Sequence, residues 1–258
     1  MAESTAPAAL VTGAGRRIGR AIALALAEDG YAVAVHYDRS RVEALAVVEG
    51  IRARGGRAEA LEADLADPAA VGGLVPRAGD ALGPLGVLVN NASLFERDLL
   101  SSVTPASWRA HLAVNLEAPV FLTQAFARQL PASTTGNVVN MIDQKVLNLS
   151  PFYLSYTAAK AALWALTQTL ALELAPTIRV NAIGPGPTLP NAIQSEADFE
   201  RYARSMPLGR GVALDDVTRT VRYILATPAL TGHLIPIDGG EHLGWATPKS
   251  WRAAREQG

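Results

Sequence analysis

Short runs of apolar residues alternate with longer amphipathic segments along most of the chain. The short runs have the length of buried strands, and the longer segments have the spacing of helices that pack against a core. The apolar runs predict seven strands, at Ala8–Val11, Tyr31–His36, Ala58–Ala63, Val87–Asn90, Asn137–Ile142, Arg179–Ile183 and Leu234–Ile237. The longer segments predict helices at Arg17–Asp29, Arg41–Arg54, from Asp67-Pro68 onward, at Ala106–Gln129 (one helix or two abutting ones), Ser155–Leu174 and Asp215–Ala226.

This order of elements predicts an α/β fold in a single domain. Alternating strands and helices imply right-handed crossovers, and hence a mostly parallel sheet with helices on both faces. No repeat or linker divides the 258 residues, so we expect one domain over 1–258. The Gly- and Pro-rich segment Gly184–Ser195 predicts a loop over a site, leading into a small helix near Glu196–Ser205. Together they form an expected substrate insertion at about 184–210.

Composition narrows the class of protein. The chain is 49% hydrophobic and 18% charged, as in ordinary globular proteins, and its net charge of −1 gives no electrostatic reason to expect nucleic acid or an anionic membrane as a partner. The absence of cysteine excludes disulfides, thiolate catalysis and sulfur-ligated metals. Met1–Leu10 lacks the features of a signal peptide, and no apolar stretch reaches membrane-spanning length. We therefore expect a soluble cytoplasmic protein that acts on a small molecule.

A glycine-rich turn, Thr12-Gly13-Ala14-Gly15-Arg16-Arg17-Ile18-Gly19, lies directly between the first predicted strand and the first helix. In a βαβ unit this is where the backbone N–H groups of a helix N-terminus bind a dinucleotide pyrophosphate, and glycines allow its close approach. The alternative is an ordinary glycine-rich turn, which the position at the start of a βαβ unit makes the weaker interpretation. The turn predicts a Rossmann-type dinucleotide-binding domain.

The end of the second strand distinguishes NAD from NADP. An acidic residue there accepts the ribose hydroxyls of NAD, whereas basic and hydroxyl side chains accommodate the 2′-phosphate of NADP. Arg39 offers a charge-assisted phosphate contact, Ser40 a hydroxyl and His36 a further donor, while Asp38 favours the opposite choice. Arg16 adds positive charge from the glycine turn. The balance predicts NADPH rather than NADH.

Tyr156 and Lys160 form a candidate catalytic pair. They are four residues apart in a predicted helix, so their side chains lie on one face. A tyrosine with a pKa of about 10 is a poor acid or base at neutral pH, and a nearby ammonium or an oxidised nicotinamide would lower that pKa. Alone, such a pair is most often a surface coincidence. It gains weight from the cofactor turn upstream and from Asp143, at the end of the fifth strand.

These motifs, with Asn90-Asn91-Ala92, Asn115 and Pro185-Gly186, resemble the short-chain dehydrogenase/reductase family in the family's order and over nearly the whole chain. The resemblance implies a seven-stranded doubly wound sheet, usually in a homotetramer. It also implies that Tyr156 donates the proton, that Lys160 holds the ribose and tunes Tyr156, and that Asn115 supports a water relay.

Two departures from the common family pattern point to a narrower group. Arg17 replaces the usual second glycine of the turn, and Asp143 replaces the usual catalytic serine thirteen residues before the tyrosine. Both changes resemble the pteridine reductases, a group that also places a serine and a phenylalanine where this chain has Ser93 and Phe95. That resemblance implies that Phe95 stacks on a pterin opposite the nicotinamide, that Ser93 contacts pterin or cofactor, and that Arg17 faces pterin and phosphates.

The expected chemistry is the reduction of a ring C=N bond, which needs a hydride on carbon and a proton on nitrogen. A carboxyl at position 143 can hydrogen-bond Tyr156 and relay that proton, and a flat heteroaromatic substrate suits an aromatic stacking partner. The expected catalytic residues are Asp143, Tyr156, Lys160 and Asn115. The expected substrate-binding residues are Arg17, Ser93, Phe95, Asp143, Tyr156, Pro187 and Leu189.

The cofactor-binding set combines the glycine turn, the ends of the strands and the catalytic pair. The family resemblance implies that Asp64 contacts adenine and that Asn90 lies beside the cofactor. The full set is Gly13, Arg16, Arg17, Ile18, Gly19, His36, Tyr37, Arg39, Ser40, Asp64, Leu65, Asn90, Ala92, Ser93, Tyr156, Lys160, Pro185 and Gly186. No metal ligands are expected.

Several alternatives stay open from the sequence. Phe95 could be a core or hinge residue, and Arg17 could simply pair with a nearby acid. Asp143 could disable the site, which would make the chain a non-catalytic NADP-binding sensor, although Tyr156, Lys160 and Asn115 are all present. The remaining alternative is a carbonyl or alcohol oxidoreductase of the same superfamily with an unusual acid in its active site.

Overall fold

Seven strands form one parallel sheet in the computed structural model, which describes residues 7–191 and 194–244. The strand order is β3-β2-β1-β4-β5-β6-β7, and each neighbouring pair is parallel. The strands are β1 (Ala8–Val11), β2 (Ala32–Tyr37), β3 (Ala58–Glu62), β4 (Leu85–Asn90), β5 (Gly136–Met141), β6 (Ile178–Pro185) and β7 (Leu234–Ile237). The expected single-domain, doubly wound Rossmann-type fold is confirmed.

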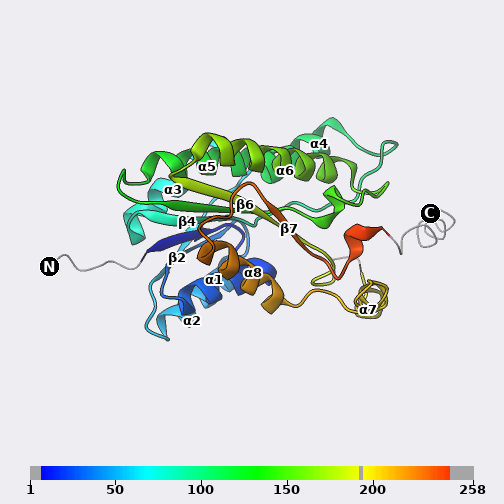
Figure 1. Ribbon diagram of the computed structural model, residues 1–258, viewed down its shortest axis with the longest axis horizontal. Coiled ribbons are helices and arrows are strands. Elements are labelled where there is room, and N and C mark those ends of the chain that lie inside the picture. Colours follow the sequence, from blue (N-terminus) through cyan, green and yellow to red (C-terminus); the bar gives the residue numbers. More distant parts are fainter. Residues whose placement is uncertain (1–6, 192–193, 245–258) are drawn as a thin grey trace.

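Helices cover both faces of this sheet (Figure 1). On one face lie α1 (Arg17–Glu28), α2 (Arg41–Arg52) and α8 (Leu214–Ala226). The opposite face carries α3 (Pro68–Leu82), α4 (Pro105–Leu112), α5 (Ala118–Gln129) and α6 (Leu154–Leu174). The short helix α7 (Glu196–Arg204) lies apart from both layers, beyond the carboxyl end of β6.

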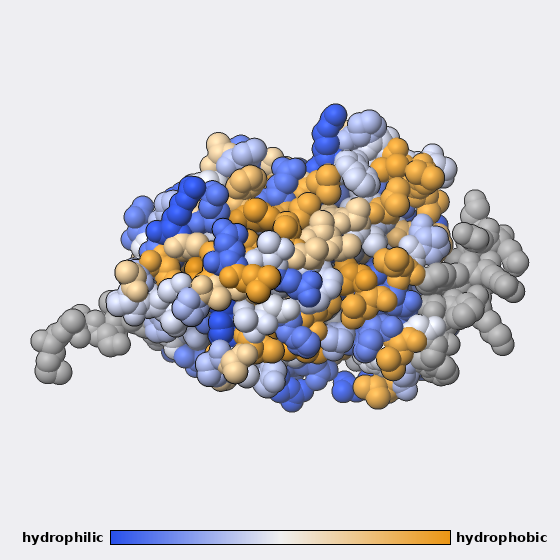
Figure 2. Space-filling model, turned by 45° about the horizontal axis from the view of Figure 1, so that its top comes forward, coloured by the Kyte–Doolittle hydropathy of each residue, from blue (hydrophilic) through white to orange (hydrophobic). Residues whose placement is uncertain are grey.

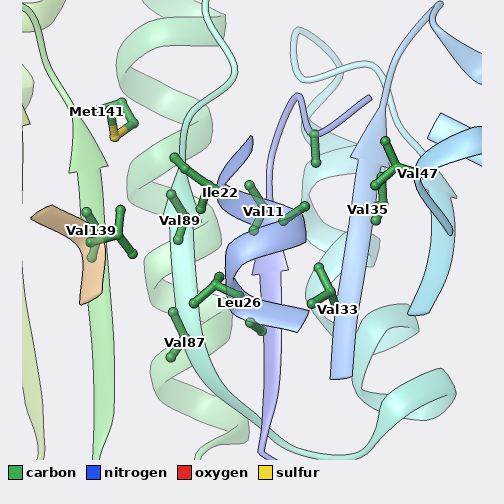
Figure 3. Close-up of a cluster of buried hydrophobic side chains, with 14 of the residues drawn as sticks. Val11, Ile22, Leu26, Val33, Val35, Val47, Val87, Val89, Val139 and Met141 are labelled. Atoms are coloured by element: carbon green, nitrogen blue, oxygen red, sulfur yellow. The ribbon is translucent and has the colours of Figure 1, made fainter. Parts of the chain in front are cut away.

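The core explains why the strands are so rich in valine and alanine. Both faces of the central strands are covered, so β1 and β2 are buried at every position instead of alternating between apolar and polar. Figure 3 shows α1 packed over β1, with Ile22 and Leu26 of the helix facing Val11, Val87 and Val89 of the sheet. A second apolar cluster, which includes Leu74, Leu122 and Phe126, fills the space beneath α3 and α5.

The structure decides between two predicted alternatives and corrects one predicted boundary. The segment Ala106–Gln129 contains two α-helices, α4 and α5, separated by a π-helical turn at Ala113–Glu117. Gly184 and Pro185, expected to open the substrate loop, instead belong to the end of β6, where Pro185 lies opposite Ile237 of β7. Pairing with β7, which is more than 45 residues away along the chain, extends β6 beyond its locally apolar part.

No helix within 7–191 and 194–244 is long and apolar enough to cross a membrane, and no cluster of His, Asp and Glu in those ranges could hold a metal ion. The cytoplasmic location expected from the sequence stays a prediction.

The strand order reverses its direction of growth between β1 and β4. The connections that follow these two strands therefore leave on opposite faces of the sheet, and a crevice opens at the carboxyl ends of the strands. This crevice holds the candidate site.

Candidate active site

A cavity of about 800 Å³ lies at the carboxyl ends of the strands. Its walls include the glycine turn, the ends of β2 and β4, Asp143, the first turns of α6, the loop after β6 and α7. All the expected cofactor-binding and substrate-binding residues line this cavity except Asn90. Of the expected catalytic residues, Asp143, Tyr156 and Lys160 line it, whereas Asn115 does not. Residues from six strand ends and from helices α1, α4, α6 and α7 therefore meet in one place.

Two glycines of the turn are required by close packing. Gly13 has φ 63°, a left-handed conformation, and a Cβ at Gly19 would lie 2.3 Å from the carbonyl oxygen of Gly13. The turn is therefore compact, with α1 starting close to the end of β1. Backbone N–H groups at such a helix N-terminus are suited to binding a diphosphate.

The turn is also tied to the strand beside it. The Thr12 hydroxyl accepts hydrogen bonds from the backbone N–H groups of Asn91 and Ala92, both at 2.9 Å, and the Asn91 amide donates to the carbonyl of Thr12. Asn90 faces the other way and donates to Asn140 at 2.8 Å in the buried interior. Asn91 rather than Asn90 lines the cavity, because side chains alternate along the end of β4.

His36 supports the turn from β2. Its Nδ1 accepts a hydrogen bond from the backbone N–H of Gly13 at 2.9 Å, and its Nε2 lies 3.0 Å from the carbonyl oxygen of Ala63. A carbonyl only accepts, so Nε2 carries the proton and the ring is neutral. Burial lowers the pKa of His36 to about 4. Both nitrogens are thus used within the protein, which differs from the expected role as a donor to the cofactor phosphate.

The cations expected near an adenosine phosphate lie on the rim of the cavity. The Arg39 side chain is 92% exposed, and among the described residues its one ion pair is a long contact of 3.4 Å to Asp38, so its guanidinium can turn toward a ligand. Arg16 reaches Glu43 at 3.7 Å, with both side chains exposed. Exposed pairs of this kind contribute little energy and are easily exchanged for a stronger anion.

Arg17 has an unusual backbone and an unusual set of partners. Its φ of 55° lies in the left-handed region, which explains why glycine is common at this position of the family turn. Its guanidinium donates to the carbonyl oxygens of Pro190 at 2.8 Å and Leu189 at 3.3 Å. Arg17 therefore joins the glycine turn to the loop after β6. Its partners are carbonyl oxygens, whereas the alternative interpretation expected an ion pair with a nearby acid.

Asp143 and Tyr156 are hydrogen-bonded to each other in the wall of the cavity. The Tyr156 hydroxyl donates to Asp143 Oδ2 at 2.9 Å, and the backbone N–H of Lys145 donates to Asp143 Oδ1 at 2.8 Å. Burial and the Asp143 carboxylate raise the pKa of Tyr156 well above its ordinary value. This corrects the expectation of a lowered pKa. The carboxylate accepts a hydrogen bond directly from the phenol, so the neutral form of Tyr156 is favoured.

Lys160 lies beside the same pair. It is almost fully buried, and its ammonium donates to the carbonyl oxygen of Met141 at 2.7 Å. Burial lowers the pKa of Lys160 to about 8, although Asp143 acts in the opposite direction. Its Nζ lies 5.8 Å from the centre of the Tyr156 ring, one helical turn away on α6, as the four-residue spacing predicted.

Asn115 acts on the strand-end segment that follows β4. From the π-helical turn, its Oδ1 accepts hydrogen bonds from the Ser93 hydroxyl at 2.9 Å and the Leu94 N–H at 3.0 Å. Its Nδ2 donates to the Leu94 carbonyl at 2.8 Å. Asn115 thus holds the segment that carries Ser93 and Phe95 against the cavity.

Phe95 presents its ring to the cavity and is 37% exposed, so it is not a core residue. It stacks on Tyr153, with ring centroids 4.3 Å apart, and meets Tyr156 edge-on at 4.7 Å. Phe95 and Tyr153 therefore lie together with Tyr156 in a cluster of three aromatic rings. A flat apolar ligand finds a stacking surface here.

Lys145, Tyr202 and Glu241 also line the cavity but were not identified from the sequence. Burial alone would lower the pKa of Lys145, but Asp143 and Glu241 outweigh it and raise that pKa. Tyr202 of α7 donates a hydrogen bond to the Glu241 carboxylate, which links the insertion to the segment after β7. Lys145 could have been suspected from its place two residues after Asp143, whereas the Tyr202–Glu241 contact spans 39 residues and has no local signal.

Comparisons with known proteins agree with this geometry. Residues 7–201 match the family model described as short chain dehydrogenase. Among curated proteins, a 3-oxoacyl-[acyl-carrier-protein] reductase from Synechocystis is 35% identical over 93% of this chain and 98% of its own length. An uncharacterized oxidoreductase from Methylorubrum extorquens is 38% identical over 90% of this chain and 96% of its own length.

Solved structures show a second kind of relative. FolM alternative dihydrofolate reductase 1 from Brucella suis, in complex with NADP, is 48% identical over 94% of this chain and 98% of its own, with a TM-score of 0.91. A short chain dehydrogenase from Burkholderia cenocepacia, also in complex with NADP, is 39% identical over 91% of this chain and 97% of its own, with a TM-score of 0.84. Fold, motif order and sequence identity agree, and the chain belongs to the short-chain dehydrogenase family of oxidoreductases.

Proposed function

We propose that the protein is an NADPH-dependent pteridine reductase, which reduces a dihydropterin to a tetrahydropterin and also accepts an oxidised pterin. The main observation behind this proposal is the hydrogen bond from Tyr156 to Asp143 in the cavity wall. The exposed ring of Phe95 lies beside this pair and lines the same cavity. The Brucella relatives named as alternative dihydrofolate reductases, both solved with NADP, support the same assignment.

The residues of the cavity fit an NADP molecule. The compact turn around Gly13 and Gly19 brings backbone N–H groups to the start of α1, where a diphosphate would bind. A Cβ at either glycine would clash with neighbouring protein atoms and distort this turn. Arg39, Ser40 and Arg16 lie beside the end of β2, where a 2′-phosphate would bind, and the exposed Arg39 is free to contact it. Asp64 and Leu65 provide the wall for adenine, and Lys160 would hold the nicotinamide ribose. When bound, NADPH supplies the hydride and leaves as NADP⁺.

The acid chemistry comes from the chain itself. Reduction of a C=N bond converts the carbon to C–H and the nitrogen to N–H, so one proton must reach the ring nitrogen. Tyr156 is the phenol placed to donate that proton. Burial and Asp143 raise its pKa, which makes it a weaker acid, whereas the Lys160 ammonium and the oxidised nicotinamide would lower that pKa during the reaction. Asp143 borders both Tyr156 and the cavity, and it is placed to pass a replacement proton to the phenol.

The aromatic wall selects the shape of the substrate. Phe95 offers a ring face to a flat heterocycle, while Pro187 and Leu189 provide an apolar rim on the loop after β6. Arg17 and Ser93 supply polar contacts at the edge of the same space. A planar ring held between Phe95 and the nicotinamide would place its C=N bond near Tyr156.

A carbonyl reductase is the second candidate. This candidate is supported by several curated relatives that are named 3-oxoacyl-[acyl-carrier-protein] reductases and are 34–35% identical to this chain. A carbonyl reductase uses a hydroxyl donor to stabilise a developing alkoxide, however, and this chain has the carboxyl of Asp143 at that position. A carboxylate there repels negative charge on oxygen, and this favours pterin over ketone.

The function is tested by Phe95→Ala, with Tyr223→Ala on the outer face of α8 as a control that removes an exposed aromatic ring elsewhere. Loss of stacking should raise the KM for a dihydropterin about tenfold, because an aromatic pair contributes roughly 0.5–1.5 kcal/mol beyond its buried area. The Kd for NADPH should stay close to that of wild type. Dihydropterin kinetics as unaffected in Phe95→Ala as in Tyr223→Ala would exclude the stacking role.

We also propose that the chain assembles into a homotetramer, as the family resemblance implies. Large apolar side chains are exposed on the outer face formed by α5 and α6, including Phe121 and Leu172. Figure 2 looks toward this side of the protein, and apolar residues gather across it. Contiguous exposed apolar surface of this kind is typical of a protein interface, here with further copies of the same chain.

A further inference from the structure

A group of three buried polar side chains, Asp98, His111 and Ser155, lies outside the cavity and takes no part in the proposed chemistry. Asp98 follows the segment that carries Phe95, His111 belongs to α4, and Ser155 directly precedes Tyr156 in the first turn of α6. Asp98 is 5% exposed, and the other two are fully buried. Buried polar groups of this kind are costly unless every hydrogen bond is satisfied.

The hydrogen bonds within the group are well defined. The Ser155 hydroxyl donates to Asp98 Oδ2, and the Ser155 N–H donates to Asp98 Oδ1 at 3.2 Å. His111 Nδ1 lies 2.9 Å from the Ser107 carbonyl oxygen and 2.8 Å from Ser155 Oγ. Since the carbonyl only accepts, Nδ1 carries the proton, and Ser155 Oγ accepts from it while donating to Asp98.

The same group holds the loop before it. His111 Nε2 accepts a hydrogen bond from the backbone N–H of Glu96 at 3.2 Å. The Asp98 carbonyl accepts from the backbone N–H of Tyr153 at 3.0 Å, and Tyr153 in turn stacks on Phe95. Three separate segments, 95–98, α4 and the start of α6, are thus joined at the point from which Phe95 and Tyr156 project.

We propose that Asp98, His111 and Ser155 are positioning residues that fix the stacking ring of Phe95 relative to the hydroxyl of Tyr156. Asp98 caps the start of α6 from a different segment, since that helix has Tyr153 in a left-handed conformation and no side-chain cap of its own. Errors of about 1 Å in such an alignment can cost up to a hundredfold in rate. The role of Phe95 rests on the proposed pteridine reductase function, whereas the placement of Tyr156 does not.

The test compares Ser155→Ala and Asp98→Asn with the control Thr157→Val. Thr157 lies in the same turn of α6, and its hydroxyl is buried without a hydrogen-bond partner among the described residues. The kinetics with a dihydropterin are measured well below Tm. The maximal rate is divided by the concentration of NADPH-binding sites to give kcat per site, so that unfolded protein is not counted, and KM is taken directly from the same curves. Ser155→Ala keeps its backbone N–H bond to Asp98, and Asp98→Asn keeps an acceptor for it, so the two variants perturb the group in different ways.

We expect Ser155→Ala and Asp98→Asn each to lower kcat per site by about tenfold or more, with NADPH affinity unchanged. The double variant should cost little more than either single one, because the three side chains act as a unit. Thr157→Val should retain wild-type kcat per site. A lower Tm with unchanged kcat per site in both variants would overturn the proposal and leave a purely structural role.

Failure of the proposed function has a different signature. If the wild-type enzyme reduces carbonyl compounds and not dihydropterins, the pteridine reductase assignment is wrong. The same variants are then compared on the carbonyl substrate, where a loss of kcat per site still supports the placement of Tyr156 and an unchanged kcat still contradicts it.

Discussion

The protonation of a few buried side chains decides what this cavity can do. Tyr156 is held as a neutral phenol by burial and by Asp143, and His36 is held as a neutral imidazole by burial and by its two partners. Both effects follow from the cost of placing charge in a region of low dielectric. The first keeps the proton on the phenol that we propose as the donor, and the second shapes the turn at which the cofactor is expected to bind.

His36 makes folding stability depend on pH. Its folded-state pKa of about 4 lies below the ordinary value of 6.5, so the unfolded chain binds the extra proton more readily. The stabilisation is fully present above pH 6.5 and is lost as the pH falls to about 4. The loss in the free energy of unfolding amounts to roughly 3 kcal/mol, at 1.36 kcal/mol per pKa unit.

Urea unfolding of wild type and His36→Gln at pH 7.0, 5.5 and 4.0 measures this contribution. Glutamine can accept from the Gly13 N–H and donate to the Ala63 carbonyl, but it does not titrate. The free-energy difference between the two proteins should therefore shrink or change sign in acid. Parallel pH profiles for the two proteins would show that His36 is not the titrating group.

Several site residues were predictable because their chemistry has a local signal. Gly13, Gly19, Tyr156, Lys160 and Asp143 belong to short motifs or to fixed spacings, and the structure places all of them on the cavity. Asp98, by contrast, meets Ser155 across 57 residues, and only the folded chain brings these partners together. The orientation of Asn90 was also hidden, since the neighbouring Asn91 has the same side chain and the opposite direction.

At the scale of the elements, the glycine turn contacts the loop after β6 through the side chain of Arg17. Arg17 makes this contact through two carbonyl hydrogen bonds while holding a left-handed backbone conformation. That conformation costs a residue with a Cβ roughly 1–2 kcal/mol, whereas glycine adopts it freely. The chain therefore keeps a strained residue where its side chain can reach the loop after β6.

Substitutions at Arg17 separate the side chain from the backbone strain. Arg17→Ala loses the hydrogen bonds and keeps the strain, so it should unfold with less free energy than Arg17→Gly by about 1 kcal/mol. Both variants should raise the KM for the substrate, since both release the loop. Chemical denaturation and steady-state kinetics check the two statements. A glycine variant less stable than the alanine variant would contradict the assigned strain.

The elements themselves were predicted to within one or two residues at most ends, because buried parallel strands and amphipathic helices carry strong periodic signals. The π-helical turn at Ala113–Glu117 was not predicted, since apolar spacing hardly changes when a single extra residue enters a helix. That turn carries Asn115 and allows it to bind Ser93 and Leu94. The longer β6 depended on its pairing with β7.

For the assembled protein, the exposed face of α5 and α6 predicts association. Leu172 is 84% exposed and Phe121 is 50% exposed, and neither residue lines the cavity. Light scattering after gel filtration should give four times the mass of one chain. The double variant Phe121→Glu/Leu172→Glu should give smaller species, because buried carboxylates without partners oppose association. A monomeric wild-type protein at micromolar concentration would rule out the tetramer.

The fold brings the cofactor turn, the Asp143–Tyr156 pair and the Phe95 ring to one edge of the sheet, and this combination is the basis of the assignment as a pteridine reductase. The decisive measurement is the rate of NADPH oxidation with a dihydropterin, set beside a panel of small ketones and an NADH control, for wild type and Asp143→Ser. We predict rapid dihydropterin reduction that prefers NADPH, and a loss of at least about a hundredfold in Asp143→Ser, within the range of general acid catalysis. Turnover confined to ketones, or dihydropterin turnover that Asp143→Ser leaves unchanged, would contradict this account. Tight NADPH binding without turnover of either substrate would also contradict it and would indicate a sensor instead of an enzyme.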